Sequence, residues 1–226
     1  MVSLRLYFLG LFLMFTFFYS ALLRAGTIED GRVWLTYTLQ HPINEMWKVT
    51  LQAQPYWRDE GHAYDQVTYR PGVYYRFNQA WSLGAGYAYA LGHPQSGNST
   101  HEHRLWEDVI RNFSFDDSTQ LSVRTRLEHR HTEHQEGALH GLREYIRWST
   151  PLNGTYQFVV ADECYLNLND GQNTDVGFDQ NRLFFGVAAK IDSSFVVEVG
   201  YMNQYAKRSV PDVENHILSL SVNQTF

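Results

Sequence analysis

Residues 101–131 read HEHRLWEDVIRNFSFDDSTQLSVRTRLEHRH, and this stretch decides the fold. Two segments of alternating character flank the turn-forming residues 115–118, which is the pattern of a β-hairpin. Successive side chains of a strand point to opposite faces, so the odd positions form an aliphatic face and the even positions a charged one. The charged positions are Glu102, Arg104, Arg124, Arg126, Glu128 and Arg130. So much arginine and glutamate on one face indicates that these side chains pair.

The same alternation recurs from residue 33 to the C-terminus, in segments of about ten residues separated by turn residues. Short connections alternate with long ones. Most apolar faces are aliphatic in the middle and carry Tyr or Trp near the ends, whereas the opposite faces are small, polar or charged. This arrangement is typical of a membrane barrel, so we expect an all-β fold, an antiparallel transmembrane β-barrel of about 10–12 strands.

A soluble barrel of the lipocalin type is the alternative fold. Such a barrel would enclose apolar side chains and show its charges to water. Here the charged faces also hold many Gly and Ser residues together with Arg and Glu that can pair. A polar lumen explains that composition more simply than a charged outer surface does.

The number of strands is less certain from the pattern alone. Eleven alternating segments can be counted, whereas single-chain bacterial barrels normally have an even number of strands. The segments 33–39 and 216–226 would also run in the same direction and could not pair antiparallel. Either the barrel has ten strands and starts near Glu45, or residues 26–32 form a twelfth strand. The second arrangement is slightly favoured.

Composition limits the function classes. The net charge is −6, and the 18 lysines and arginines are spread singly along the chain. No nucleic-acid partner is therefore expected. Aromatic residues make up 15% of the chain, and the mean hydropathy of −0.38 is too polar for a helical membrane protein. With one cysteine, Cys164, the chain cannot form an intramolecular disulfide.

The N-terminus differs from the rest of the chain. Arg5 precedes an apolar run over residues 6–19, and small residues follow up to Ala25. A positive start, an apolar core and small residues predict a secretory signal peptide over residues 1–25, followed by the barrel domain over 26–226. An uncleaved anchor helix over residues 6–23 is the alternative. Either interpretation predicts that the body of the chain is exported.

Charged side chains of the even-numbered face are expected to meet inside the barrel. A turn centred on Asp116 would place Glu102 opposite Arg130 and Arg104 opposite Glu128. Later segments add more charges to the same interior: Arg143, Arg147, Glu163, Arg182 and Glu198. Cross-strand pairing of opposite charges favours one register. This pairing predicts a lumen largely filled by ion pairs. The more specific alternative is a polar conduit or a site for a phosphate or carboxylate ligand.

Histidines gather at the long-loop end of neighbouring segments. Those with the spacing of possible metal ligands are His101, His103, His129 and His131, with His93, His134 and His140 nearby. Their odd positions point outward, so we interpret them as residues at the rim of the barrel rather than as a metal site. No metal or other cofactor is expected. No serine, aspartate or histidine lies in a recognisable nucleophile context, so no catalytic residue is assigned.

Several short motifs carry a resemblance to a known family. They are Arg70-Pro-Gly72, Glu102-His-Arg-Leu-Trp106, Arg126-Leu-Glu-His-Arg130, Gly177-Phe-Asp-Gln-Asn-Arg182 and the terminal Phe226. With these motifs the chain resembles an uncharacterised family of Gram-negative outer-membrane β-barrels, a domain-of-unknown-function family, over nearly all of its mature length. The resemblance implies an outer-membrane location and a barrel fold, and it implies no activity.

The function expected is that of an outer-membrane barrel with a charged, largely plugged lumen and a structural or narrow-pore role. The expected partners are outer-membrane lipid, lipopolysaccharide and the barrel-assembly machinery; the oligomeric state is open. The alternative is an outer-membrane protein that binds or modifies lipid through its rim histidines. A soluble exported carrier is a third interpretation.

Overall fold

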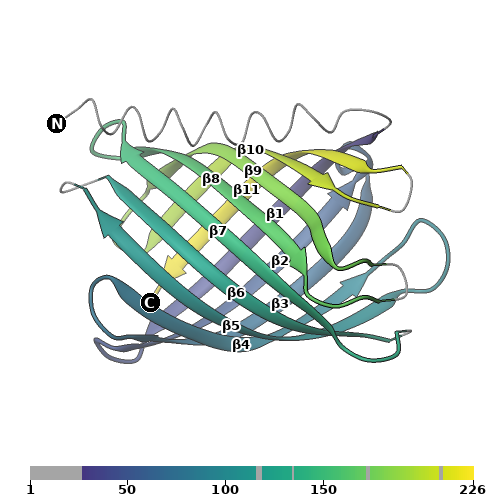
Figure 1. Ribbon diagram of the computed structural model, residues 1–226. Helices are drawn as coiled ribbons and strands as arrows, with labels where there is room; N and C mark the ends of the chain where they lie inside the picture. The colour runs from purple at the N-terminus through teal and green to yellow at the C-terminus, as the bar shows by residue number, and fades with distance from the viewer. Residues whose placement is uncertain (1–26, 116–118, 134, 172–173, 209–210) are drawn as a thin grey trace.

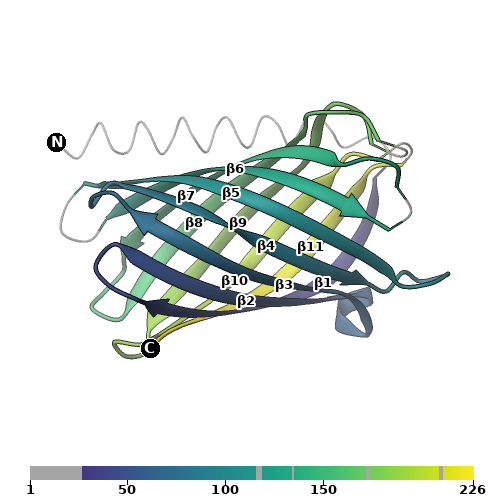
Figure 2. The same ribbon diagram turned by 90° about the horizontal axis from the view of Figure 1, so that it is seen from below.

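The computed structural model describes residues 27–115, 119–133, 135–171, 174–208 and 211–226. Eleven strands form one closed barrel (Figures 1 and 2), which confirms the expected all-β fold. The strands are β1 (Ile28–Pro42), β2 (Trp47–Arg58), β3 (Ala63–Arg76), β4 (Trp81–Gly92), β5 (Thr100–Ser114), β6 (Gln120–Thr132), β7 (Leu139–Pro151), β8 (Tyr156–Asn167), β9 (Gly177–Lys190), β10 (Phe195–Ala206) and β11 (Val213–Thr225). The predicted signal peptide lies outside the described residues. Within those residues, no helix has the length and apolar character needed to cross a membrane.

Each strand pairs antiparallel with its neighbours in the chain, and the barrel closes where β1 pairs with β11 in parallel. The eleven strands fall within the expected range of about 10–12, but neither even-numbered alternative, ten or twelve, was right. Residues 28–32 do not form a separate strand, because they are the first part of β1 and pair with residues 213–217 of β11. An odd number of antiparallel strands leaves the first and last strands pointing the same way. A parallel ladder joins them because it also satisfies the backbone N–H and C=O groups.

The two ends of the barrel differ. One end, here called the short-turn end, carries the connections 43–46, 77–80, 115–119, 152–155 and 191–194, together with the C-terminus. The other, the long-loop end, carries the remaining connections and the start of β1. Four short turns share one device: an Asn or Asp oxygen accepts backbone N–H groups two and three residues later, as at Asn44, Asn78, Asn153 and Asp192. These side chains explain where the chain reverses.

Alternate side chains of each strand point into the lumen, and the lumen is the core of the protein. The most deeply buried large side chains are Trp106, Arg126 and Ile217. Trp106 fits because two paired glycines face it: a Cβ at Gly72 would come within 2.6 Å of its ring, and one at Gly86 within 2.4 Å. A small apolar cluster of Val159, Ala161, Phe184 and Ala188 fills another sector of the interior.

The parallel closure makes a specific prediction about cross-linking. In a Cys164→Ala background, the pairs Val33→Cys with Leu218→Cys and Tyr37→Cys with Val222→Cys should both react with a short bifunctional maleimide, because each pair is in register across β1 and β11. Gel mobility after unfolding reports the intramolecular link. The control pair Val33→Cys with Val222→Cys should not link, because four residues separate those positions by about 13 Å along a strand. An antiparallel closure could satisfy only one of the two pairs.

Candidate functional site in the barrel lumen

The β5–β6 hairpin differs in register from the expected one. Arg104 pairs with Arg130, Trp106 with Glu128 and Asp108 with Arg126, two residues away from the predicted partners. The reason is the hydrogen bond that closes the hairpin: the N–H of Phe115 donates to the carbonyl of Thr119, so the numbers of facing residues sum to 234 instead of 232. A shift of two residues keeps every side chain on its original face. The even-numbered charges of the hairpin therefore still point into the lumen.

The most buried ion pair joins Arg126 and Asp108. The Nε and Nη2 atoms of Arg126 donate to the two carboxylate oxygens of Asp108 at 2.6 and 2.8 Å, and both side chains are almost fully buried. The guanidinium also lies over the ring of Trp106, 4.4 Å from its centroid. Sequence reasoning missed Asp108 and Trp106. Both lie on the even positions of residues 101–131, so the alternation that identified the other charges could have found them.

Arg143 connects two further carboxylates. Its Nη1 donates to Glu128 at 2.6 Å and its Nη2 to Glu163 at 2.7 Å. Glu163 also accepts from Arg124, at 2.5 Å, and from the hydroxyl of Tyr165, at 2.8 Å. One carboxylate on β8 thus holds arginines from β6 and β7, with a tyrosine of its own strand completing its hydrogen bonds.

The remaining predicted charges join the same interior. Glu102 accepts from Arg104 at 2.9 Å and from Arg130 at 2.5 Å, Arg182 lies 3.8 Å from Glu163, and Arg147 pairs with Glu198. Every predicted lumen charge therefore has an opposite charge beside it. We call the full set, with Asp108 added, the lumen network: Glu102, Arg104, Asp108, Arg124, Arg126, Glu128, Arg130, Arg143, Arg147, Glu163, Arg182 and Glu198.

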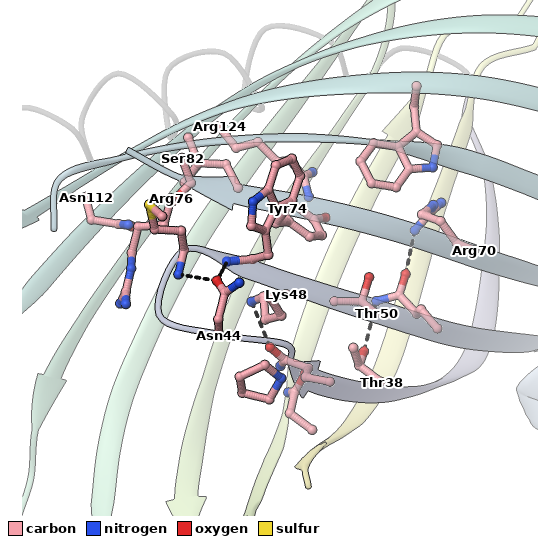
Figure 3. A pocket seen from close by; sticks show the side chains of 18 of the residues that line it. Thr38, Asn44, Lys48, Thr50, Arg70, Tyr74, Arg76, Ser82, Asn112 and Arg124 are labelled. Atoms are coloured by element: carbon pink, nitrogen blue, oxygen red, sulfur yellow. Dashed lines mark hydrogen bonds between the residues drawn. The ribbon is translucent and has the colours of Figure 1, made fainter. Parts of the chain in front are cut away.

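A cavity of about 790 Å³ lies between the lumen network and the short-turn end of the barrel (Figure 3). Side chains of β1 to β6 point into it, and residues 44–46 of the first short turn border it. Its charged lining residues are Lys48, Arg70, Arg76, Arg124, Arg126 and Glu45. Sequence reasoning did not single out Lys48 or Arg70, because each stands alone between neutral residues in its strand.

The predicted rim histidines that the structure describes lie at the long-loop end on the outer wall, and most of them lie beside another aromatic or imidazole ring. The Nδ1 of His101 lies 2.6 Å from the hydroxyl of Tyr89, and His103 contacts Tyr87 in the same way. His129 and His140 approach each other, with 2.8 Å between their Nδ1 atoms. His131 is exposed near the end of β6, and His134 lies outside the described residues. In the part of the chain that the structure describes, no three His, Cys, Asp or Glu side chains gather closely enough to hold a metal ion.

Removing one partner of the buried pair should be costly. Asp108→Ala leaves the guanidinium of Arg126 buried beside Trp106 without its carboxylate, and we expect the free energy of unfolding to fall by about 3–5 kcal/mol. Urea titration of the refolded protein, followed by tryptophan fluorescence, measures it. The double variant Asp108→Ala/Arg126→Met should recover part of the loss. Arg208→Ala, which breaks the exposed pair with Asp179, should cost less than about 1 kcal/mol. Equal losses for Asp108→Ala and Arg208→Ala would contradict the importance of the buried pair.

Comparison with known proteins places this barrel in a family. A family model described as "Protein of unknown function (DUF2490)" matches residues 31–215, which run from within β1 into β11. An uncharacterized protein of Methylorubrum extorquens is 31% identical over 203 residues, covering 88% of this chain and 89% of the relative. No solved structure matches the chain. The match spans nearly the whole barrel, and the chain therefore belongs to the family described as protein of unknown function, DUF2490.

Proposed function

We propose that the protein is an integral barrel of the Gram-negative outer membrane, with a structural or narrow-pore role and a lumen largely plugged by its own side chains. The observation that carries this proposal is the distribution of polarity across the barrel wall. Ion pairs fill the interior, whereas large apolar side chains cover the outside. A barrel surrounded by water would favour the reverse arrangement.

The outer wall fits a lipid environment in detail. Aliphatic side chains at mid-strand are strongly exposed, among them Leu51, Leu105, Val109 and Leu218. Exposed aromatic side chains at or next to strand ends are Trp47, Tyr64, Phe77, Trp81 and Tyr156, whereas Tyr87 and Tyr201 lie at mid-strand, paired with Leu105 and Leu218. An apolar band bordered by aromatic side chains matches the hydrocarbon core and the headgroup regions of a bilayer. So much exposed apolar surface would be a liability in water.

The plug is supported by contacts between strands that are not neighbours. Arg124 on β6 reaches Glu163 on β8, and Arg147 on β7 reaches Glu198 on β10. The guanidinium of Arg182 on β9 lies 4.7 Å from the ring centroid of Trp34 on β1. Such contacts pass through the lumen rather than along its wall. They leave little continuous space for ions to move through.

The proposed partners follow from the orientation usual for such barrels, with short turns in the periplasm and long loops outside. The Tyr–His pairs at the long-loop end, such as Tyr89 with His101, would then lie at the level of the lipopolysaccharide headgroups. The C-terminal Phe226, exposed at 65% and stacked on His41, would face the periplasmic side. We propose that this exposed ring is a contact for the barrel-assembly machinery.

A lipid-facing substitution separates a membrane barrel from a soluble one. Leu105→Arg places a charge on the outer wall near the middle of β5, and we expect it to lower the stability of the bilayer-inserted protein by about 2–4 kcal/mol. Ile43→Arg is a matched control, because Ile43 is equally exposed at 59% but lies in a short turn. It should change the stability by less than about 1 kcal/mol. Reversible urea unfolding from phosphatidylcholine vesicles measures both, and equal effects would argue against membrane insertion at mid-strand.

Planar-bilayer recordings test the plug. The wild-type protein should show little or no steady current, because the lumen network crosses its interior. Removing a charge together with its partner, in Glu128→Ala/Arg143→Ala, should open a path and give resolvable channels. Arg208→Ala at the long-loop end is the control and should stay closed. A large steady conductance of the wild-type protein would refute the plug while leaving the barrel itself untouched.

A further inference from the structure

We propose that the cavity at the short-turn end is a binding site for a small organic anion that carries a phosphate or carboxylate group. The first argument is its charge. Five cationic side chains line the cavity against one carboxylate, that of Glu45: Lys48, Arg70, Arg76, Arg124 and Arg126. Arg124 and Arg126 pair with Glu163 and Asp108 behind the cavity wall, which leaves three cations without a carboxylate partner. This imbalance concentrates positive charge within a low-dielectric wall, where it attracts anions more strongly than in water.

The second argument is that three of these cations pair with neutral oxygens. Arg70 donates through Nη1 to the amide oxygens of Gln52 and Gln54, at 2.5 and 3.1 Å. Lys48 donates to the amide oxygen of Gln40 at 2.9 Å, and Arg76 to the backbone carbonyl of Glu45. Among the residues described, none of the three cations forms an ion pair with a carboxylate. Amide and carbonyl oxygens satisfy the hydrogen bonds but leave the positive charge uncompensated.

The third argument comes from buried donors on the cavity wall that have no acceptor. The Nη1 of Arg126 and the Nε1 of Trp106 are buried without a hydrogen-bond partner, although their side chains are only 2% and 1% exposed. Buried donors are normally satisfied, so each one left over calls for an explanation. The Glu128 carboxylate oxygen nearest the Nη1 of Arg126 lies 3.9 Å away, beyond hydrogen-bond distance, and an anionic oxygen would reach either donor only if the donor's side chain turned toward the cavity. Guanidinium groups suit this role because their forked donors match the oxygens of phosphate and carboxylate.

The size and lining of the cavity narrow the class of ligand. A volume of about 790 Å³ lies in the range of sites for small organic molecules, about 300–1,000 Å³. The rings of Trp106 and Tyr74 and the side chain of Ile110 add an apolar surface to the cationic one. Figure 3 shows Lys48, Thr50, Arg70 and Tyr74, from β2 and β3, around the common space. An anion with an apolar portion therefore fits better than bare phosphate does.

The position of the cavity indicates how a ligand would enter. Residues 44–46 of the short turn border one side, while the lumen network closes the side toward the long loops. A ligand therefore enters from the short-turn end. That this end faces the periplasm rests on the proposed function, whereas the anion site itself does not.

Calorimetric titration of the full mature chain, refolded in dodecyl maltoside, tests the site. The probes are phenyl phosphate, inorganic phosphate and dihexanoyl phosphatidic acid, with glycerol as the neutral control. Phenyl phosphate should bind with one site per chain, and more tightly than inorganic phosphate. Lys48→Gln/Arg70→Gln should weaken its binding at least tenfold, because two of the three uncompensated cations are lost and no carboxylate is left without a partner.

Matched variants keep the result interpretable. Lys190→Gln/Lys207→Gln removes the same charge from exposed positions outside the cavity and should leave the affinity within twofold. If Lys48→Gln/Arg70→Gln does not refold, shown by loss of heat-modifiable gel mobility, Arg76→Gln at the exposed mouth replaces it. We expect Arg76→Gln to weaken binding about threefold, with Lys190→Gln as its control.

Each outcome either supports or overturns the site. Tighter binding of phosphatidic acid assigns a phospholipid headgroup, and tighter binding of phenyl phosphate assigns a soluble phosphate ester; both uphold an anion site. The proposal is overturned if the wild-type protein binds no anion, or if the cavity and control variants lose affinity equally. These measurements use detergent and no membrane current, so their failure is distinguishable from the failure of the proposed function.

Discussion

A charge inside this barrel must meet an opposite charge, and most of the interior is arranged around that requirement. Arg126 and Asp108 form an ion pair that is almost completely buried, and Arg143 donates hydrogen bonds to both Glu128 and Glu163. Removing either partner would leave an uncompensated ion in a low-dielectric space. The same requirement makes the arginines with only neutral partners, such as Arg70, the most informative residues of the lumen.

The lumen divides into two regions along the barrel axis. Toward the long-loop end, guanidinium and carboxylate groups fill the space between non-neighbouring strands. Toward the short-turn end, shorter side chains such as Thr38, Thr50 and Ser82 leave a cavity. Trp106 lies at the boundary, with Gly72 and Gly86 making room for its ring and the guanidinium of Arg126 against its face. The lumen is filled toward the long-loop end and has an open cationic cavity toward the short-turn end. This arrangement suits binding of a ligand from the short-turn end better than passage of a ligand through the barrel.

Closure of the barrel shows where a general rule gave the wrong answer. Eleven alternating segments could be counted from the sequence, and the shared direction of the first and last segments was also apparent. The preference for an even number of strands then suggested ten or twelve. The error lay in treating parallel pairing as unavailable, although β1 and β11 align over thirteen residue pairs, from Ile28 with Val213 to Gln40 with Thr225. The count of eleven alternating segments in this sequence was a better guide to the strand number than the even numbers usual in other barrels.

The sequence by itself determined the barrel and the inward face of each predicted charge, because a strand alternates its side chains with a period of two. Alternation survives a register error of two residues, so Glu102, Arg104, Arg126 and Glu128 were assigned to the interior although the predicted register was wrong. The expected pairs still meet diagonally, Glu102 with Arg130 at 2.5 Å and Arg104 with Glu128 at 3.9 Å. Only the tertiary structure decided which charges meet, since Arg124 and Glu163 are joined across the lumen rather than by a turn. It also decided that Arg70 and Lys48 share a cavity with Arg126, because barrel curvature brings β2, β3 and β6 around one space. The local sequence pattern determines which face of the sheet a side chain points to, and closure of the sheet into a barrel determines which residues it contacts there.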